Sequence, residues 1–128
     1  MKTEMRYSRQ REAILLNLRS RCDHPDADEV YTSVREVYPN ISLGTVYRNL
    51  RQLNECGEII CFSDGKRERF DGDTRLHYHF ICTACNTVFD IFSDEVSQFL
   101  LNAQGKLDCE IDRATMVLNG RCRSCCEK

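Results

Sequence analysis

Residues 26–57, DADEVYTSVREVYPNISLGTVYRNLRQLNECG, decide the fold of the N-terminal half. Asp26 and Glu29 have the spacing of a capping box. The apolar residues that follow recur at helical intervals, at Ala27, Val30, Tyr31, Val34 and Val37. Pro39 stops this helix. A second helix opens at Ser42 and ends before Gly57, and its apolar positions are Leu43, Val46, Leu50 and Leu53.

Elements on both sides of this stretch complete a winged helix-turn-helix. Ser8 is a good N-cap for a helix over residues 9–20. Residues 58–62 have strand character, and the pair Asp64-Gly65 is a hairpin turn signal. The return strand carries Lys66, Arg67 and Arg69. We therefore predict a winged-helix DNA-binding domain over residues 1–71.

The helix after Ser42 has one face suited to DNA. At 100° per residue, Arg48 lies nearly opposite Leu50, the centre of the apolar stripe. Such a polar face can lie in a major groove, although an ordinary solvated face has the same pattern. The hairpin would contact phosphates. The predicted DNA-binding residues are Ser42, Thr45, Tyr47, Arg48, Arg51, Gln52, Lys66 and Arg67.

A polar hinge, residues 72–76, precedes a smaller domain over residues 77–128. Its pattern predicts strands at 77–81 and 86–92, then a helix that begins after Ser93 and ends at Gly105. The apolar face of this helix contains Val96, Phe99, Leu100 and Ala103, and residues 107–118 form one strand or two. A domain this small usually needs a metal or a partner chain. The expected class is α+β, with a C-terminal α/β dimerisation domain stapled by zinc.

Nine cysteines are unusual in a chain of 128 residues. Four of them form two CxxC pairs, Cys82 with Cys85 and Cys122 with Cys125. Four thiolates close a tetrahedral zinc shell, so this site would be structural. A redox CxxC is the alternative, and Cys126 could compete with Cys125. The sequence does not assign roles to the others: Cys22, Cys56, Cys61, Cys109 and Cys126.

Charge and hydropathy limit the function classes. The chain has 18 Lys and Arg against 20 Asp and Glu, so nucleic-acid binding needs a local patch. Residues 1–70 carry a net charge of +1 and residues 71–128 a net charge of −3. No apolar run suits a membrane helix, and the charged first twelve residues do not fit a secretory signal. We expect a cytoplasmic protein without a membrane partner.

The three histidines suggest a second, mixed metal site. His77 and His79 project from one face of a predicted strand, with Asp90 on the next strand and Asp71 at the domain boundary. His24 belongs to the other half, where it is either a surface histidine or a ligand that bridges the domains. Nitrogen and oxygen ligands of this kind suit Fe(II), Mn(II) or Zn(II).

Several motifs in order resemble the ferric uptake regulator family. They are residues 24–31 (HPDADEVY), 45–50 (TVYRNL), 69–71 (RFD) and 77–85 (HYHFICTAC). Asp71 and the lack of a His-rich run before His79 favour the peroxide-responsive repressor branch, PerR, over the iron sensors. The resemblance implies a regulatory site of His24, Asp71, His77, His79 and Asp90, and zinc on Cys82, Cys85, Cys122 and Cys125.

The resemblance also implies a homodimer that binds a palindromic operator in double-stranded DNA. It implies a repressor that needs Fe(II) or Mn(II) and senses hydrogen peroxide when iron-catalysed chemistry oxidises His24 or His77. A same-family iron- or zinc-responsive uptake regulator is the first alternative. A zinc-dependent hydrolase is a remote one, because no HExxH motif or nucleophile constellation is present. We do not expect an enzyme.

Overall fold

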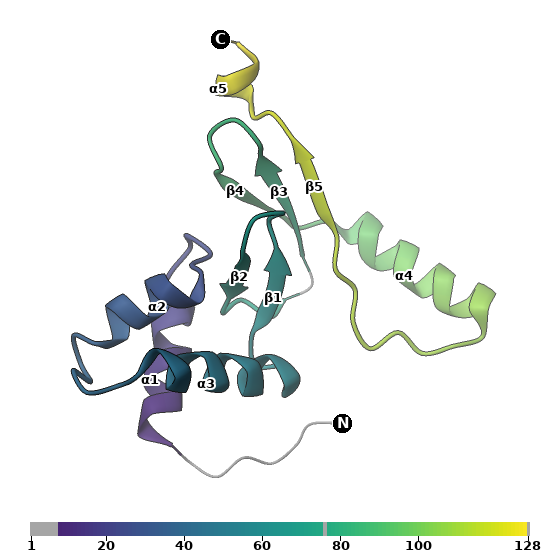
Figure 1. The fold of residues 1–128 in the computed structure, drawn as a ribbon. Coiled ribbons are helices and arrows are strands. Elements are labelled where there is room, and N and C mark those ends of the chain that lie inside the picture. The colour runs from purple at the N-terminus through teal and green to yellow at the C-terminus, as the bar shows by residue number, and fades with distance from the viewer. Residues whose placement is uncertain (1–7, 76, 128) are drawn as a thin grey trace. The chain divides into compact units, whose positions relative to one another are not determined.

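A computed structural model describes residues 8–75 and 77–127 and divides the chain into two compact units, residues 1–74 and 75–128. The first unit contains three helices and a two-stranded hairpin, and the second contains a three-stranded sheet and two helices (Figure 1). The fold is therefore α+β, with a winged helix-turn-helix followed by a small α/β unit, as the sequence predicts. No helix within the described ranges is long and apolar enough to cross a membrane.

The three helices of the first unit begin at the predicted caps. They are α1 (Arg9–Arg19), α2 (Ala27–Val34) and α3 (Leu43–Glu55). Ser8 Oγ accepts a hydrogen bond from the Arg11 backbone N–H at 3.3 Å, and Ser42 caps α3 in the same way. The Asp26–Glu29 capping box is present in both directions. These bonds satisfy backbone donors that would otherwise lack partners at the helix ends.

The apolar stripes of these helices meet in one core. Its main members are Ile14, Leu18, Val30, Val34, Val46, Leu50, Leu53 and Phe70. Two residues of the predicted apolar faces are exposed: Leu43, the first residue of α3, by 36% and Val37 by 71%. The helix α2 ends at Val34, and the Val37 and Tyr38 N–H groups both donate to the Val34 carbonyl. This turn redirects the chain before Pro39, so Val37 leaves the apolar face.

The predicted hairpin follows α3 and consists of β1 (Ile60–Ser63) and β2 (Glu68–Asp71). The strands pair antiparallel, with Ile60 opposite Asp71 and Ser63 opposite Glu68. Gly65 has a φ of 92°, which only glycine adopts without strain. This glycine lets the hairpin turn sharply, and β2 delivers Asp71 to the end of the wing.

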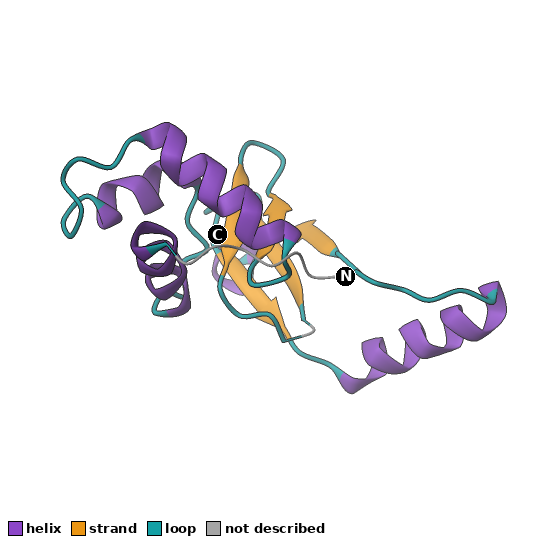
Figure 2. Ribbon diagram, turned by 90° about the horizontal axis from the view of Figure 1, so that it is seen from below, coloured by secondary structure: helices purple, strands orange, loops and turns teal. Residues whose placement is uncertain are grey.

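The second unit is built on a sheet with strand order β4-β3-β5, labelled in Figure 1. Figure 2 shows the strands of the chain in orange and the helices in purple. The central strand β3 (Tyr78–Cys82) pairs antiparallel with β4 (Val88–Ile91) and parallel with β5 (Val117–Gly120). The first and last strands of this unit are therefore neighbours. Their pairing brings the two CxxC segments to the same end of the sheet.

Two predictions for this unit are wrong in their bounds. The helix α4 (Asp94–Leu107) continues through Gly105 and ends at Asp108, which adopts a left-handed conformation with a φ of 51°. Asp tolerates this conformation, so the C-cap does not need the glycine. Within residues 107–118 only the last two are in a strand, where Val117 pairs with His79 and Leu118 with Phe80 of β3. A short helix, α5 (Arg123–Cys126), was not predicted.

Candidate metal centres and DNA-binding surface

The four predicted zinc ligands lie together. One sulfur from each of Cys82, Cys85, Cys122 and Cys125 lies within 4.8 Å of the others. Cys82 ends β3, and the Thr83 N–H donates to the Gly120 carbonyl at 2.8 Å, which holds the two CxxC segments side by side. Cys126 is exposed, and its sulfur lies 3.3 Å from the Arg121 carbonyl oxygen. Cys125 is therefore the fourth member of the cluster, and Cys126 is not.

Backbone N–H groups stabilise the thiolate form of Cys82 in this cluster. The N–H groups of Cys122 and Cys85 each donate to Cys82 Sγ at 3.4 Å, and they lower the pKa of the Cys82 thiol to about 5. The neighbouring sulfurs, Cys122 first, raise the pKa of the Cys125 thiol to about 12. Four thiolates at this spacing repel one another unless a cation lies among them. The donor set and geometry therefore fit zinc.

The first unit contributes one imidazole and one carboxylate to the predicted mixed site. His24 and Asp71 are both buried, and His24 Nε2 lies 3.4 Å from Asp71 Oδ2. Two ligand atoms at right angles on one metal ion, each at about 2.1 Å, would be about 3 Å apart. The pair is therefore spaced much as two ligands of one ion are.

The second unit brings together His77, His79 and Asp90. The register of β3 and β4 places His79 opposite Asp90, and the Nε2 atoms of both histidines lie 3.5 Å from Asp90 Oδ1. His77 Nδ1 lies 2.6 Å from the Arg75 carbonyl oxygen. This contact requires the proton on Nδ1, so the Nε2 lone pair can bind a metal. The Phe92 ring stacks on His77 with 4.7 Å between centroids, which fixes the plane of the imidazole.

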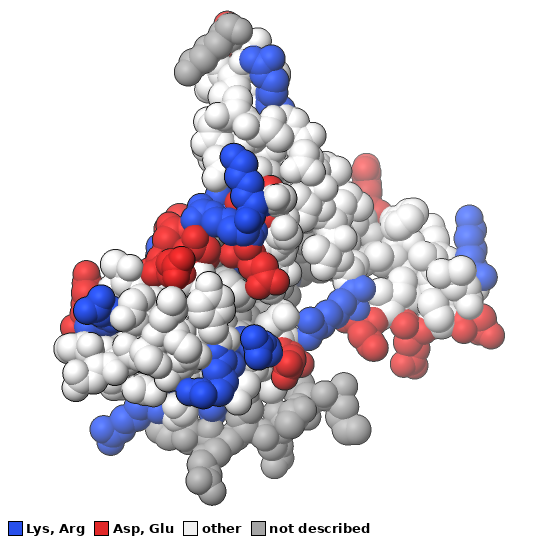
Figure 3. Space-filling model, in the orientation of Figure 1, with Lys and Arg blue, Asp and Glu red and all other residues white. Residues whose placement is uncertain are grey.

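The predicted DNA-binding side chains on α3 are largely accessible. Ser42, Tyr47, Arg48 and Arg51 are exposed, and Thr45 and Gln52 are half-buried. Basic side chains lie over α3 in Figure 3. Arg48 Nη2 donates to Thr45 Oγ1 at 3.2 Å, and Thr45 lies 2.8 Å from the Ser42 hydroxyl. These contacts set Arg48 over the helix N-terminus without burying it.

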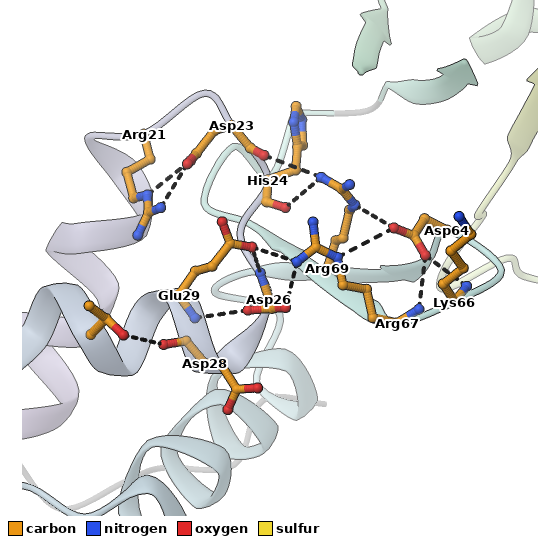
Figure 4. Close-up of polar contacts among 11 residues, drawn as sticks. Arg21, Asp23, His24, Asp26, Asp28, Glu29, Asp64, Lys66, Arg67 and Arg69 are labelled. Carbon is orange, nitrogen blue, oxygen red and sulfur yellow. Dashed lines mark hydrogen bonds and ion pairs between the residues drawn. The ribbon is translucent and has the colours of Figure 1, made fainter. Parts of the chain in front are cut away.

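The basic residues of the wing differ from one another. Lys66 is exposed, whereas Arg67 Nη1 contacts Asp26 Oδ2 at 2.6 Å and Glu29 Oε1 at 2.8 Å (Figure 4). Arg69 is only 4% exposed, so it cannot provide the phosphate contact expected of a basic wing residue. Sequence reasoning missed these ion pairs because each partner lies far from its arginine along the chain. The acidic residues near Arg67 in the chain, Asp64 and Glu68, give no signal of its pairing with Asp26 and Glu29.

Comparisons with known proteins agree on one family. The profile of the Ferric uptake regulator family matches residues 2–119. The peroxide-responsive repressor PerR of Staphylococcus aureus is 35% identical over 126 residues, which cover 97% of this chain and 84% of that protein.

Two solved structures have a similar fold. The peroxide stress regulator of Campylobacter jejuni superposes with a TM-score of 0.81 at 28% identity, covering 91% of this chain and 88% of that one. The ferric uptake regulator of Pseudomonas aeruginosa with manganese gives a TM-score of 0.79 at 25% identity, covering 93% and 91%.

Proposed function

Because the chain belongs to the ferric uptake regulator family, we propose that it is a metal-dependent repressor that senses hydrogen peroxide by oxidation of a histidine ligand. Members of this family are transcriptional regulators, which confirms that the chain is not an enzyme and excludes the hydrolase. It is a metal-responsive regulator related to PerR. Its place of action would be the cytoplasm, where bacterial DNA is accessible.

Zinc would occupy the site of Cys82, Cys85, Cys122 and Cys125. Cys82 closes the central strand and Cys122 follows the last one, so an ion bound there would tie the two ends of the second unit together. Four sulfur ligands leave no open position for substrate. The role is therefore structural.

The regulatory ion would be Fe(II) or Mn(II), held by His24, Asp71, His77, His79 and Asp90. The observation that supports this best is that each unit separately presents buried imidazole Nε2 atoms 3.4–3.5 Å from a carboxylate oxygen. Neither unit alone offers more than three ligands. We propose that one ion takes ligands from both units and so favours the arrangement that binds DNA. An ion can bias such an equilibrium only by binding one arrangement more tightly.

Regulators of this family bind DNA and act as dimers. In the second unit, no residue of α4 is buried, and Phe99 and Leu107 are 63% and 70% exposed. These apolar side chains suit the contact between two copies. We propose that the dimer presents two α3 helices to the half-sites of a palindromic operator, with Ser42, Thr45, Tyr47, Arg48, Arg51, Gln52, Lys66 and Arg67 near the DNA.

We expect Arg48→Ala to weaken specific operator binding about 10-fold or more. A bidentate arginine–base contact contributes roughly 1–3 kcal/mol of discrimination, so its loss should reduce specific more than non-specific affinity. The measurement is a titration of the Mn(II)-loaded dimer on an operator selected from random duplexes and on a scrambled duplex. Arg35→Ala, which removes an exposed arginine at the end of α2, is the matched control. Unchanged specific affinity in Arg48→Ala would remove Arg48 from base readout.

Peroxide should release the iron form from the operator and leave the manganese form bound. Bound Fe(II) would supply the redox catalysis for this step: peroxide would be the two-electron oxidant, one of its oxygen atoms would enter an adjacent imidazole, and the other would leave as water. A tryptic peptide that contains His24 or His77 should then gain about 16 Da, one oxygen atom. The measurement combines operator binding and peptide mass spectrometry before and after peroxide.

Two other results would contradict peroxide sensing through histidine. Mass gain confined to cysteines, with loss of zinc, would identify a thiol sensor. An iron form that stays on the operator after peroxide would indicate an iron- or zinc-responsive uptake regulator, the alternative that the same nitrogen and oxygen ligands support.

A further inference from the structure

The wing holds the backbone of His24 through a buried arginine that has no assigned role. We infer that Arg69 is a positioning residue for the regulatory metal site: it fixes His24 so that its imidazole faces Asp71 before metal arrives. The inference rests on the proposed function, in which His24 is a ligand, and it adds a link between the DNA-binding wing and metal affinity.

His24 has a backbone conformation that needs external support. Its φ is 51°, in the left-handed region that residues other than glycine seldom adopt. It also precedes Pro25, and a residue before proline prefers an extended conformation. An unrestrained chain would therefore place this imidazole elsewhere for much of the time. Among described non-glycine residues, only Asn86 and Asp108 share a positive φ.

Arg69 supplies that support. Its Nη1 donates to the His24 carbonyl oxygen at 3.2 Å and lies 3.4 Å from the Asp23 carbonyl oxygen (Figure 4). The backbone N–H of the next residue, Phe70, donates to the Pro25 carbonyl at 2.9 Å. The strand β2 thus binds the chain on both sides of the His24–Pro25 peptide bond.

Asp64, in the hairpin turn, fixes the orientation of Arg69. Asp64 Oδ2 accepts from Arg69 Nε at 2.7 Å, and Asp64 Oδ1 accepts from the backbone N–H groups of Lys66 and Arg67. The Asp64 side chain is 0% exposed. Burial alone would raise the pKa of this carboxyl, but the donors outweigh burial and lower it to about 2. Asp64 therefore stays ionised and holds the planar guanidinium in one orientation.

The strand β2 also carries Asp71, the second proposed metal ligand of this unit. Because Asp71 terminates β2 and Arg69 lies two residues before it, the wing sets both members of the His24–Asp71 pair. A contact that orders the wing on DNA would therefore favour metal binding at His24. By thermodynamic reciprocity, metal at His24 would favour wing binding to DNA.

The test is a double-mutant cycle on the full-length, zinc-containing protein, with Mn(II) affinity as the readout. We expect Arg69→Gln to weaken Mn(II) binding 10- to 100-fold, the range typical of residues that orient a metal ligand. In a His24→Ala background the same change should have no further effect, because Arg69 acts through His24. Arg19→Gln is the control, an exposed arginine of the same unit that pairs with half-buried Glu58; it should change affinity less than about 2-fold.

Each outcome is informative. Equal effects of Arg69→Gln in the presence and absence of His24 would show a general structural role and overturn the inference. Normal Mn(II) affinity in His24→Ala would instead refute the proposed ligand set, and with it the proposed function. If Arg69→Gln reduces helix content, Arg69→Lys replaces it in the cycle. Lysine keeps the charge beside Asp64 but cannot also reach the His24 carbonyl as a fork, so the affinity should again fall only when His24 is present.

Discussion

Replacing His77 with alanine should abolish metal-dependent operator binding while one zinc ion per chain remains. His77 is proposed to bind the regulatory ion through Nε2, and its Nδ1 and ring plane are fixed by the Arg75 carbonyl and Phe92. Losing residues that only orient a ligand costs 10- to 100-fold in metal affinity, so losing a ligand should cost more than about 100-fold. Operator binding measured against Mn(II) concentration, together with zinc content, tests this.

A matched control lies next to His77 in the chain. The hydroxyl of Tyr78 is buried and has no hydrogen-bond partner among the described residues. Tyr78→Phe should therefore leave both metals and operator binding unchanged, since removing an unpaired buried hydroxyl leaves no partner unsatisfied. Zinc loss in His77→Ala would refute the division into two independent metal sites. Operator binding with the wild-type metal dependence would remove His77 from the regulatory site.

Cys82→Ser should remove the zinc ion and unfold the second unit. The Cys82 sulfur accepts two backbone hydrogen bonds at the end of the central strand, so the change removes a ligand that is already held in place. Structural zinc contributes roughly 10–16 kcal/mol of apparent binding free energy in small zinc-stabilised domains. Such a loss far exceeds the stability that so small a core supplies. Zinc analysis, thermal unfolding and the dimer's sedimentation behaviour measure the effect.

Cys126→Ser is the control for this change. Cys126 adjoins a proposed ligand but lies outside the sulfur cluster. The variant should keep one zinc per chain and an unchanged melting temperature. If Cys82→Ser also retained one zinc per chain and a folded second unit, the four-cysteine site would be wrong.

The features that could be predicted are those with local signals. The caps at Ser8, Asp26 and Ser42, and the glycine turn of the hairpin, depend on residues within four positions of one another. The CxxC spacing likewise predicts that two sulfurs can meet at one ion, and all four sulfurs do lie together. No comparable local pattern marks Asp108, whose left-handed conformation ends α4. From the sequence, the end of this helix is therefore predicted at Gly105, because glycine is the usual residue there.

Features that depend on distant partners could not be predicted. From the sequence, Arg69 is an ordinary basic residue of the wing. Its contact with the His24 carbonyl joins residues 45 positions apart, so only the fold reveals it. The strand β5 forms by pairing with β3, which lies more than 30 residues earlier in the chain. The five regulatory ligands were assigned through a family resemblance. The structure places His24 beside Asp71 in one unit, and His77 and His79 beside Asp90 in the other. That all five bind one ion stays a proposal.

The parallel pairing of β3 with β5 sets an order in which the protein can be built. The three-helix unit and the hairpin β3–β4 use neighbours in the chain, so they can form while synthesis continues. The sheet's other edge must wait for Val117–Gly120, since a non-local pairing forms only after a long loop has closed. A newborn chain would therefore complete its three-helix unit before the second unit can close its sheet, and the four sulfurs can meet only once Cys125 has been synthesised.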